Sequence, residues 1–201
     1  NLAVMGYDPA VYYTGRSPFE AISIGIKLAD DDVAFRTNLV TLSEDEPYGE
    51  KIMLDHSSDE ISTAEARLII EDINKKLGTD VFTFYPGVSY RHILIWNKAP
   101  YDFSLTPPHD IIGRKIKDYL PAGPYGAIFL KMMEESSALL KDHPVNRDRR
   151  ARGLRPANSI WIWGEGKRPA LSSFYEKYRL KGSVISAVDL IKGLGLCAGL
   201  D

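Results

Sequence analysis

The chain has 201 residues, of which 44% are hydrophobic and 26% are charged, and its formal net charge is −2. This composition is that of a soluble globular protein with one large or two small domains, and the charge argues against a generic nucleic-acid binder, which needs a basic excess. No apolar run is long enough to cross a membrane, and no signal-peptide pattern opens the chain. The single Cys197 excludes an internal disulfide and a cysteine-cluster metal site, so we expect a cytoplasmic protein with a buried, inert thiol.

Both ends of the sequence resemble the interior of a longer chain. The chain starts at Asn1 in NLAVMGY, which is typical of the interior of a helix, and Asp201 follows an apolar run directly. We therefore expect a piece of a longer protein.

Hydrophobic periodicity, capping signals and turn residues predict alternating helices and strands. In chain order these are helix 18–28, strand 33–42, strand 52–54, helix 64–77, strands 81–85 and 89–96, helix 125–140, strand 160–163, helix 172–178, strand 184–186 and helix 187–196. Ser62 and Glu65 have capping-box spacing at the start of the second helix. The fold class is therefore α/β, or α+β, with a mixed β-sheet flanked by helices.

The segment PANSIWIWGEG, residues 156–166, carries the most distinctive strand. Ile160 and Ile162 alternate with Trp161 and Trp163, which predicts a strand that is buried on both faces. Gly164–Gly166 then end the strand and let another backbone approach closely. Such a loop is a usual ligand position in α/β proteins, although an ordinary core strand and turn would have the same pattern.

Several polar side chains interrupt apolar patterns near strand ends. They are Arg36, Arg91, His92, His109, Asp110, Asn158 and Lys192. Arginine offers a bidentate fork to phosphate or carboxylate and lysine offers a point charge, so this set suits a small anion. Each also has a structural interpretation: Arg36 could be solvated, and Asp110 is a good N-cap for a segment that starts at Ile111.

Other motifs predict no catalyst. Five arginines in residues 143–156 are expected to be mostly solvated in a loop, and Met132 and Met133 are expected to fill the core. The four histidines lack the close spacing of a metal site, and there is no P-loop, Rossmann fingerprint or serine elbow. The residues alone thus indicate an anion-binding α/β domain, or a structural domain whose polar strand ends satisfy buried backbone.

Eight motifs occur in this order: NLAVMGYDP, GRSPFEA, DVAFRTNLVTL, FYPGVSYRHILIW, TPPHD, HPVN, RPANSIWIWGEG and VISAVDLIKGLG. Over essentially the whole chain they resemble the archaeal-type, cofactor-independent (2,3-bisphosphoglycerate-independent) phosphoglycerate mutases of the alkaline phosphatase superfamily. Some bacterial members have been proposed as homoserine kinases, so the substrate does not follow from the resemblance.

The resemblance implies a metal-binding catalytic core with a second domain inserted into it. Residues 1–30 would be a flank of the core, residues 31–182 the inserted lid domain, and residues 183–201 the return to the core, with hinges near 29–32 and 181–183. The catalytic serine would lie upstream of Asn1, and two divalent metals (Mn, Mg, Zn or Co) would be bound outside this fragment, which would be inactive alone.

The resemblance also implies an activity for the parent enzyme. It would interconvert 2-phosphoglycerate and 3-phosphoglycerate in glycolysis through a phosphoserine, while this portion positions the phosphorylated acid with Arg36, Arg91, His92, His109, Asp110, Asn158 and Lys192. Its partners would be this small acid and the rest of its own chain, with no nucleic acid or membrane. One departure is the acidic loop 55–60, where many relatives have arginines. This loop either faces away from the site or indicates another substrate.

Overall fold

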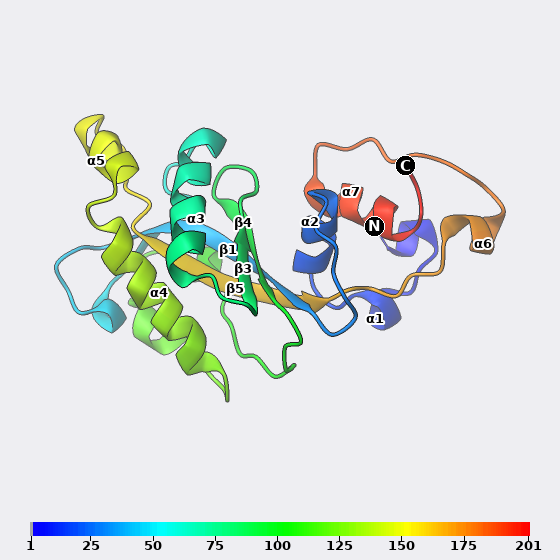
Figure 1. The fold of residues 1–201 in the computed structure, drawn as a ribbon, viewed down its shortest axis with the longest axis horizontal. Helices are drawn as coiled ribbons and strands as arrows, with labels where there is room; N and C mark the ends of the chain where they lie inside the picture. Colours follow the sequence, from blue (N-terminus) through cyan, green and yellow to red (C-terminus); the bar gives the residue numbers. More distant parts are fainter. Residues whose placement is uncertain (1) are drawn as a thin grey trace.

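The structure, a computed structural model, describes residues 2–201. A larger part built on a β-sheet and a smaller helical part that holds the chain ends lie side by side (Figure 1). The helices are α1 (Pro9–Tyr12), α2 (Ser17–Ser23), α3 (Thr63–Leu77), α4 (Gly126–Leu140), α5 (Pro144–Ala151), α6 (Phe174–Tyr178) and α7 (Asp189–Cys197). The strands are β1 (Val33–Leu42), β2 (Met53–Asp55), β3 (Phe82–Tyr85), β4 (Arg91–Trp96) and β5 (Ser159–Lys167).

The longest strand, β1, organises the sheet. It pairs along most of its length with β4 on one side and β5 on the other, β2 joins its far end, and β3 pairs with β4. All these pairs are antiparallel, so the prediction of helices and strands around one sheet is confirmed in its α+β form, and the prediction of a mixed sheet is wrong. Parallel neighbours need long crossovers, whereas β3 and β4 follow one another through a short turn.

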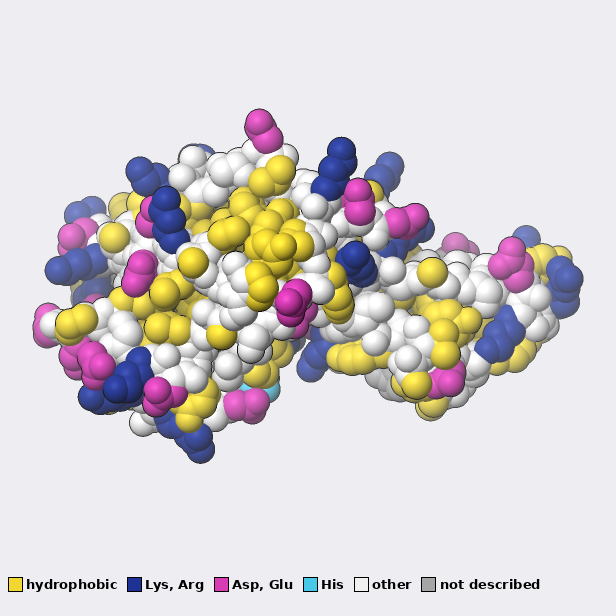
Figure 2. Space-filling model, turned by 90° about the horizontal axis from the view of Figure 1, so that it is seen from below, with side chains coloured by type: hydrophobic (Ala, Val, Ile, Leu, Met, Phe, Trp, Pro, Cys, Tyr) yellow, Lys and Arg dark blue, Asp and Glu magenta, His cyan; other side chains and the backbone are white. Residues whose placement is uncertain are grey.

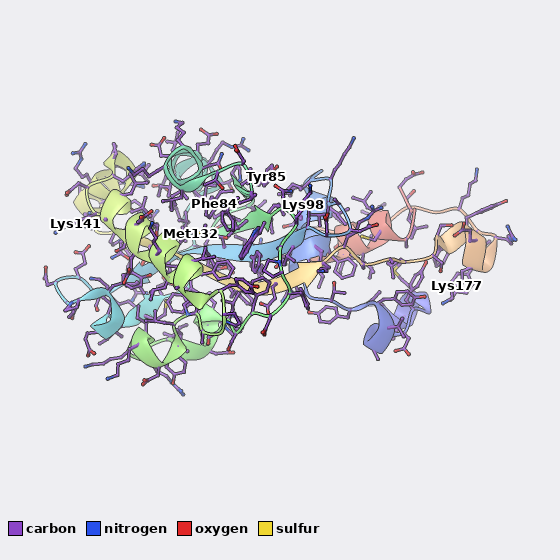
Figure 3. All side chains as sticks on the ribbon, turned by 60° about the horizontal axis from the view of Figure 1, so that its bottom comes forward. Phe84, Tyr85, Lys98, Met132, Lys141 and Lys177 are labelled. Carbon is purple, nitrogen blue, oxygen red and sulfur yellow. The ribbon has the colours of Figure 1, made fainter. Side chains whose placement is uncertain are left out.

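One face of the sheet is covered by α3 and α4. Phe35 of β1 contacts Phe129 of α4, and Ile69, Ile70 and Ile73 of α3 are fully buried in the same core. Phe84 of β3 and Met132 of α4 also belong to this core, and Figure 3 shows both between the sheet and the helices. Each fully buried apolar side chain contributes about 1.5–3 kcal/mol, so this layer dominates the stability of the larger part.

The capping box of α3 forms as predicted. The Ser62 hydroxyl accepts the Glu65 N–H, and the Glu65 carboxylate accepts the Ser62 N–H. The predicted core role of Met133 is likewise confirmed, since its side chain is fully buried.

The smaller part packs both ends of the described chain together. Tyr7 and Phe19 share a small apolar cluster with Leu194 and Ala198, and Leu171 and Phe174 pack against it. Figure 2 shows this part set off from the larger one, with apolar side chains gathered on the larger part. Lys177 in α6 and Lys141 after α4 lie at opposite ends of the molecule (Figure 3).

Three predicted elements differ from the structure. The helix that begins near Pro18 ends at Ser23, because Gly25 adopts the left-handed conformation that ends helices, with φ of 85°. Residues 184–186 are irregular rather than a strand. The arginine-rich loop contains α5, which His143 caps by accepting the Val145 N–H and which Pro144 begins.

Two solvent-exposure predictions also need correction. Arg149 in α5 is only 2% exposed, although the arginines of this segment are expected on the surface. Cys197 is half-buried, and burial raises its pKa to about 11, so the thiol stays protonated near neutral pH.

The tryptophan strand continues through its glycines. β5 runs to Lys167, and Gly164 occupies a bulge within it, so the prediction that Gly164–Gly166 form a strand-end loop is wrong. The predicted close approach is real: a Cβ on Gly166 would lie 2.8 Å from the Thr14 carbonyl oxygen. The Ser17 hydroxyl donates to the Gly164 carbonyl, which joins the start of α2 to β5.

No helix within residues 2–201 combines the length and the apolar character needed to traverse a bilayer.

Candidate functional site

The candidate site lies on the sheet face opposite α3 and α4. Neighbouring side chains of a strand point to opposite faces, so Arg36 and Asn38 of β1 point away from the face of Phe35. Trp163 of β5 pairs with Arg36, and Arg91 of β4 pairs with Asn38. Because cross-strand partners share a face, these four side chains lie together on the same face of the sheet.

Helix α2 covers the neighbouring part of this face. Ala21 of α2 packs with Ala34 of β1 and with Ile93 and Ile95 of β4. This packing brings Glu20 of α2 against that group of four side chains. Helix and sheet together therefore form a partly enclosed charged cluster.

Two arginines lie against the Glu20 carboxylate, and the charge of a third, Arg91, also acts on it. Arg36 Nε lies 3.0 Å from Glu20 Oε2, and Arg16 Nη2 lies 3.7 Å from Glu20 Oε1. Burial raises the pKa of Glu20, and the charges of Arg36, Arg16 and Arg91 oppose that rise. Burial lowers the pKa of Arg36, and Glu20 opposes this decrease. Three guanidinium groups against one carboxylate leave an excess of positive charge, which favours an anion.

One guanidinium donor in this cluster is unused by the described part of the chain. Arg91 Nε is buried and has no hydrogen-bond partner within residues 2–201. Arg36 Nε lies 3.0 Å from Glu20 Oε2 and is engaged in that ion pair. Buried polar groups are nearly always satisfied, so Arg91 Nε is a donor that acceptor oxygens of a ligand could use.

Aromatic rings and two histidines line the same region. The Arg36 guanidinium lies 4.8 Å from the Trp163 ring centroid, and the His109 ring centroid lies 5.2 Å from that of Trp163. His56 follows at 6.2 Å from His109 and 5.5 Å from Tyr90, between ring centroids. The Trp163 Nε1–H donates to Asn38 Oδ1, which fixes the ring beside Arg36.

Four predicted site residues fall in or beside this cluster. Arg36 and Arg91 are at its centre, and His109 lies at its edge with about half of its side chain exposed. The adjacent Asp110 is more exposed, and its Oδ1 lies 3.6 Å from His109 Nε2. Asp110 caps no α-helix and instead lies within the 3₁₀ turn Pro108–Ile111.

Lys192 lies on α7, a helix that packs against α2. The charge of Asp189 in the first turn of α7 acts on Glu20 of α2. Lys192 is exposed and follows Asp189 by three residues, so both lie on the same side of α7.

His92 and Asn158 lie apart from the cluster. His92 follows Arg91 in β4 and so points to the helix-covered face, where Nδ1 accepts the Gly87 N–H at 3.0 Å. Burial lowers the pKa of His92 to about 3, so it is neutral and cannot act as a cation. Asn158 uses its amide to bind both backbone groups of Leu42, about 20 Å along β1 from Arg36.

Sequence reasoning missed Arg16, Glu20, His56, Tyr90 and Trp163 as members of the cluster. Arg16 and Glu20 have the i,i+4 spacing of a helical ion pair, which is a detectable signal. The others gather through strand register and loop conformation, which no local pattern encodes.

Hydrogen bonds within the acidic loop 55–60 occupy the Asp55 carboxylate. Asp55 Oδ1 accepts the Ser57 N–H at 2.8 Å, Oδ2 accepts the Asp59 N–H at 2.7 Å, and Arg155 Nη1 lies 3.3 Å from the same Oδ2. Burial alone would raise the pKa of Asp55, but these hydrogen bonds hold that pKa below its ordinary value. Asp55 Oδ1 also lies 3.9 Å from His56 Nδ1, so the loop brings His56 to the cluster with this carboxylate beside it.

Metal ligands do not assemble in the described part of this chain. Within residues 2–201 no three His, Cys, Asp or Glu side chains come together in a way that could hold a metal ion. The cluster described above is built from cations and aromatic rings, which fit an anion and do not fit a metal.

The neutral state of His92 makes stability depend on pH. Its folded-state pKa of about 3 lies below the ordinary 6.5, so the unfolded chain binds this proton more readily. The His92 contribution is complete above pH 6.5 and is lost as the pH falls toward 3, at about 1.4 kcal/mol per pH unit. Between pH 7 and pH 5, we expect the free energy of unfolding of the wild type to fall by about 2 kcal/mol more than that of His92→Asn, as measured by urea unfolding.

Asparagine is the matched replacement because its Oδ1 can accept the Gly87 N–H without titrating. Equal losses for both proteins over this pH range would contradict a neutral buried His92.

The fold and the cluster define a class: an α+β protein whose antiparallel sheet presents a buried arginine cluster suited to a small anion. A sequence profile described as 2,3-bisphosphoglycerate-independent phosphoglycerate mutase matches residues 1–146. The chain belongs to this family, as its motifs predict.

Individual relatives agree with this assignment. A probable 2,3-bisphosphoglycerate-independent phosphoglycerate mutase of Geobacter sulfurreducens is 51% identical over all of this chain and 50% of its own length. The enzyme so named from Methanosarcina barkeri is 50% identical over all of this chain and 49% of its own. The chain therefore spans about half the length of the curated relatives it matches.

Solved structures show the same fold. A cofactor-independent phosphoglycerate mutase from Thermoplasma acidophilum has a TM-score of 0.65 and 27% identity, covering all of this chain and 54% of its own. A protein from Pyrococcus horikoshii has a TM-score of 0.70 and 26% identity, covering all of this chain and 45% of its own.

Proposed function

We propose that this chain is the substrate-positioning half of a phosphoglycerate mutase that interconverts 2- and 3-phosphoglycerate in glycolysis, in the cytoplasm. The observation that carries the proposal is the group of three arginines whose charges act on Glu20, with an unused Nε–H donor on Arg91 among residues 2–201. Phosphate and carboxylate oxygens match these donors in charge and geometry. Phosphoryl transfer depends mostly on positioning and charge stabilisation, which such a cluster supplies.

The remaining chemistry would come from outside this chain. A serine nucleophile would accept the phosphoryl group and return it to the other hydroxyl of the glycerate, and two divalent metals would activate that serine. Arg36 and Arg91 would hold the anionic groups, His109 and Asp110 would face the glycerate, and Lys192 would lie nearer the rest of the parent. His92 and Asn158 would act through the fold and not by touching substrate.

The packing also supports a revised domain arrangement. Leu171 and Phe174 pack with Tyr7 and Phe19, so the second chain crossing would lie near residues 168–170 and not near 181–183. The first crossing stays near residues 29–32, where the chain passes from α2 to β1.

Substrate binding to the chain tests this proposal. We expect 3-phosphoglycerate to change tryptophan fluorescence saturably, because Trp163 lies against Arg36. Arg91→Met should weaken this binding about 10- to 100-fold, the effect of losing one charge-assisted interaction. Arg147→Met is the matched control, since Arg147 is exposed on α5, away from the cluster.

Two alternative functions remain for the full-length protein, and enzyme assays distinguish them. A homoserine kinase-like parent would phosphorylate homoserine with ATP and would not interconvert the phosphoglycerates. A non-catalytic anion-binding module would bind 3-phosphoglycerate but would belong to a full-length protein with neither activity. Assays of the full-length protein with both substrates separate these cases.

A further inference from the structure

An unusual backbone turn precedes α3. Ser58, Asp59 and Glu60 have φ of 50°, 53° and 49°, so three consecutive residues with a Cβ are left-handed. Residues other than glycine adopt this conformation rarely and usually singly, because the Cβ approaches the carbonyl oxygen. Such a turn persists only where its surroundings hold it.

Arg149 of α5 holds this turn from a distant part of the sequence. Its guanidinium is buried and donates to the Ser58 carbonyl at 2.5 Å, to the Arg155 carbonyl at 2.9 Å and to Glu65 at 3.1 Å. Five donors in a rigid plane suit this set of acceptors in a way that lysine cannot match.

His56 lies at the start of this turn, two residues before Ser58. The His56 carbonyl accepts the Asn38 Nδ2–H at 2.9 Å, and Asn38 accepts the Trp163 Nε1–H at 3.0 Å. The His56 ring lies against Tyr90 and His109. A continuous series of contacts therefore joins Arg149 through the turn and His56 to the ring beneath Arg36.

We infer that Arg149 is a positioning residue for the anion site, acting through the left-handed turn Ser58–Glu60 to hold His56 and the Asn38–Trp163 pair in place. This inference rests on the proposed function, because it assigns a role in that same site. Arg149 touches none of the cluster side chains and therefore would not contact the substrate.

The test uses the full-length protein with Arg149→Met and with Arg149→Lys. For Arg149→Met we expect the KM for 3-phosphoglycerate to rise about 10-fold with a smaller change in kcat, and the His56 ring signals in NMR to shift. Arg149→Lys should show the same effects, since lysine cannot reproduce the planar set of donors. Arg150→Met, the neighbouring residue bonded to Glu44 and the Lys141 carbonyl, should leave both readouts unchanged.

A second substitution tests whether Arg149 acts through the turn. Glu60→Gly lowers the backbone strain at an exposed turn position, so the double variant with Arg149→Met should regain thermal stability and return the His56 signals toward those of wild type. If the single variant Arg149→Met is folded, has the wild-type KM and has unshifted His56 signals, the inference is overturned.

The NMR readout also distinguishes the two proposals. If the wild-type protein does not turn over 3-phosphoglycerate, the proposed function fails, and the His56 signals still report on Arg149. A shift in Arg149→Met then supports its positioning role, and an unchanged spectrum overturns it.

Discussion

Arg36→Met is expected to abolish measurable binding of 3-phosphoglycerate and to destabilise the fold by up to about 3 kcal/mol. The substitution removes the closest ion-pair partner of the buried Glu20, which keeps only the more distant Arg16 and the charge of Arg91 as compensation. Binding should fall by at least 100-fold, because the substitution also removes a central cation. Urea unfolding measures the first effect, and fluorescence titration measures the second.

The double variant Arg36→Met, Glu20→Gln separates these two effects. Without the carboxylate no buried negative charge lacks its closest partner, so we expect part of the stability to return while binding stays weak. The single variant should also regain stability as the pH falls, because protonation of Glu20 removes the same charge. Wild-type affinity in the double variant would contradict a direct role for Arg36 in anion binding.

Gly193→Ala is expected to disrupt the smaller part of the molecule. A Cβ at this position of α7 would lie 1.7 Å from the Phe19 carbonyl oxygen and 2.4 Å from its carbonyl carbon. Both atoms belong to the α2 backbone, so the helices must separate and expose the cluster of Phe19 and Leu194. We expect a loss of about 3 kcal/mol or more in the free energy of unfolding, at the upper end for overpacking.

Gly49→Ala is the matched control for this prediction. A Cβ there would meet only ordinary van der Waals contacts, the nearest at 3.8 Å, and the backbone is outside the left-handed region. Chemical denaturation of both variants measures the difference. Equal stabilities would show that α2 and α7 tolerate separation.

Local signals in the sequence predicted much of the fold. The helix at Ala64–Leu77 and the strand at Val33–Leu42 are well placed, because a capping box and a long apolar run specify them locally. The helix over α5 was missed, because polar arginines obscured the amphipathic pattern of a short segment. Strand direction was also not predictable, since pairing joins segments far apart in the chain.

Some residues of the candidate site could also be predicted from the sequence, and others could not. Arg36 and Arg91 stand out as charges within apolar strands, and the structure brings both to one face. Whether a neighbouring side chain faces the cluster depends on strand alternation, which turns His92 to the other side. His56 depends on a left-handed turn held by Arg149, a contact between residues far apart in sequence.

The pairing of Val33 with Lys167 has a consequence for folding. The first residue of β1 and the last residue of β5 are neighbours. In the formed sheet, the chain therefore leaves the sheet beside the point where it entered. The contact between α2 and α7 then closes a short effective loop, although nearly the whole chain separates these helices in sequence. We therefore expect the smaller part to assemble late on a finished sheet, with the long-range pairing of β1 and β5 as the slow step of folding.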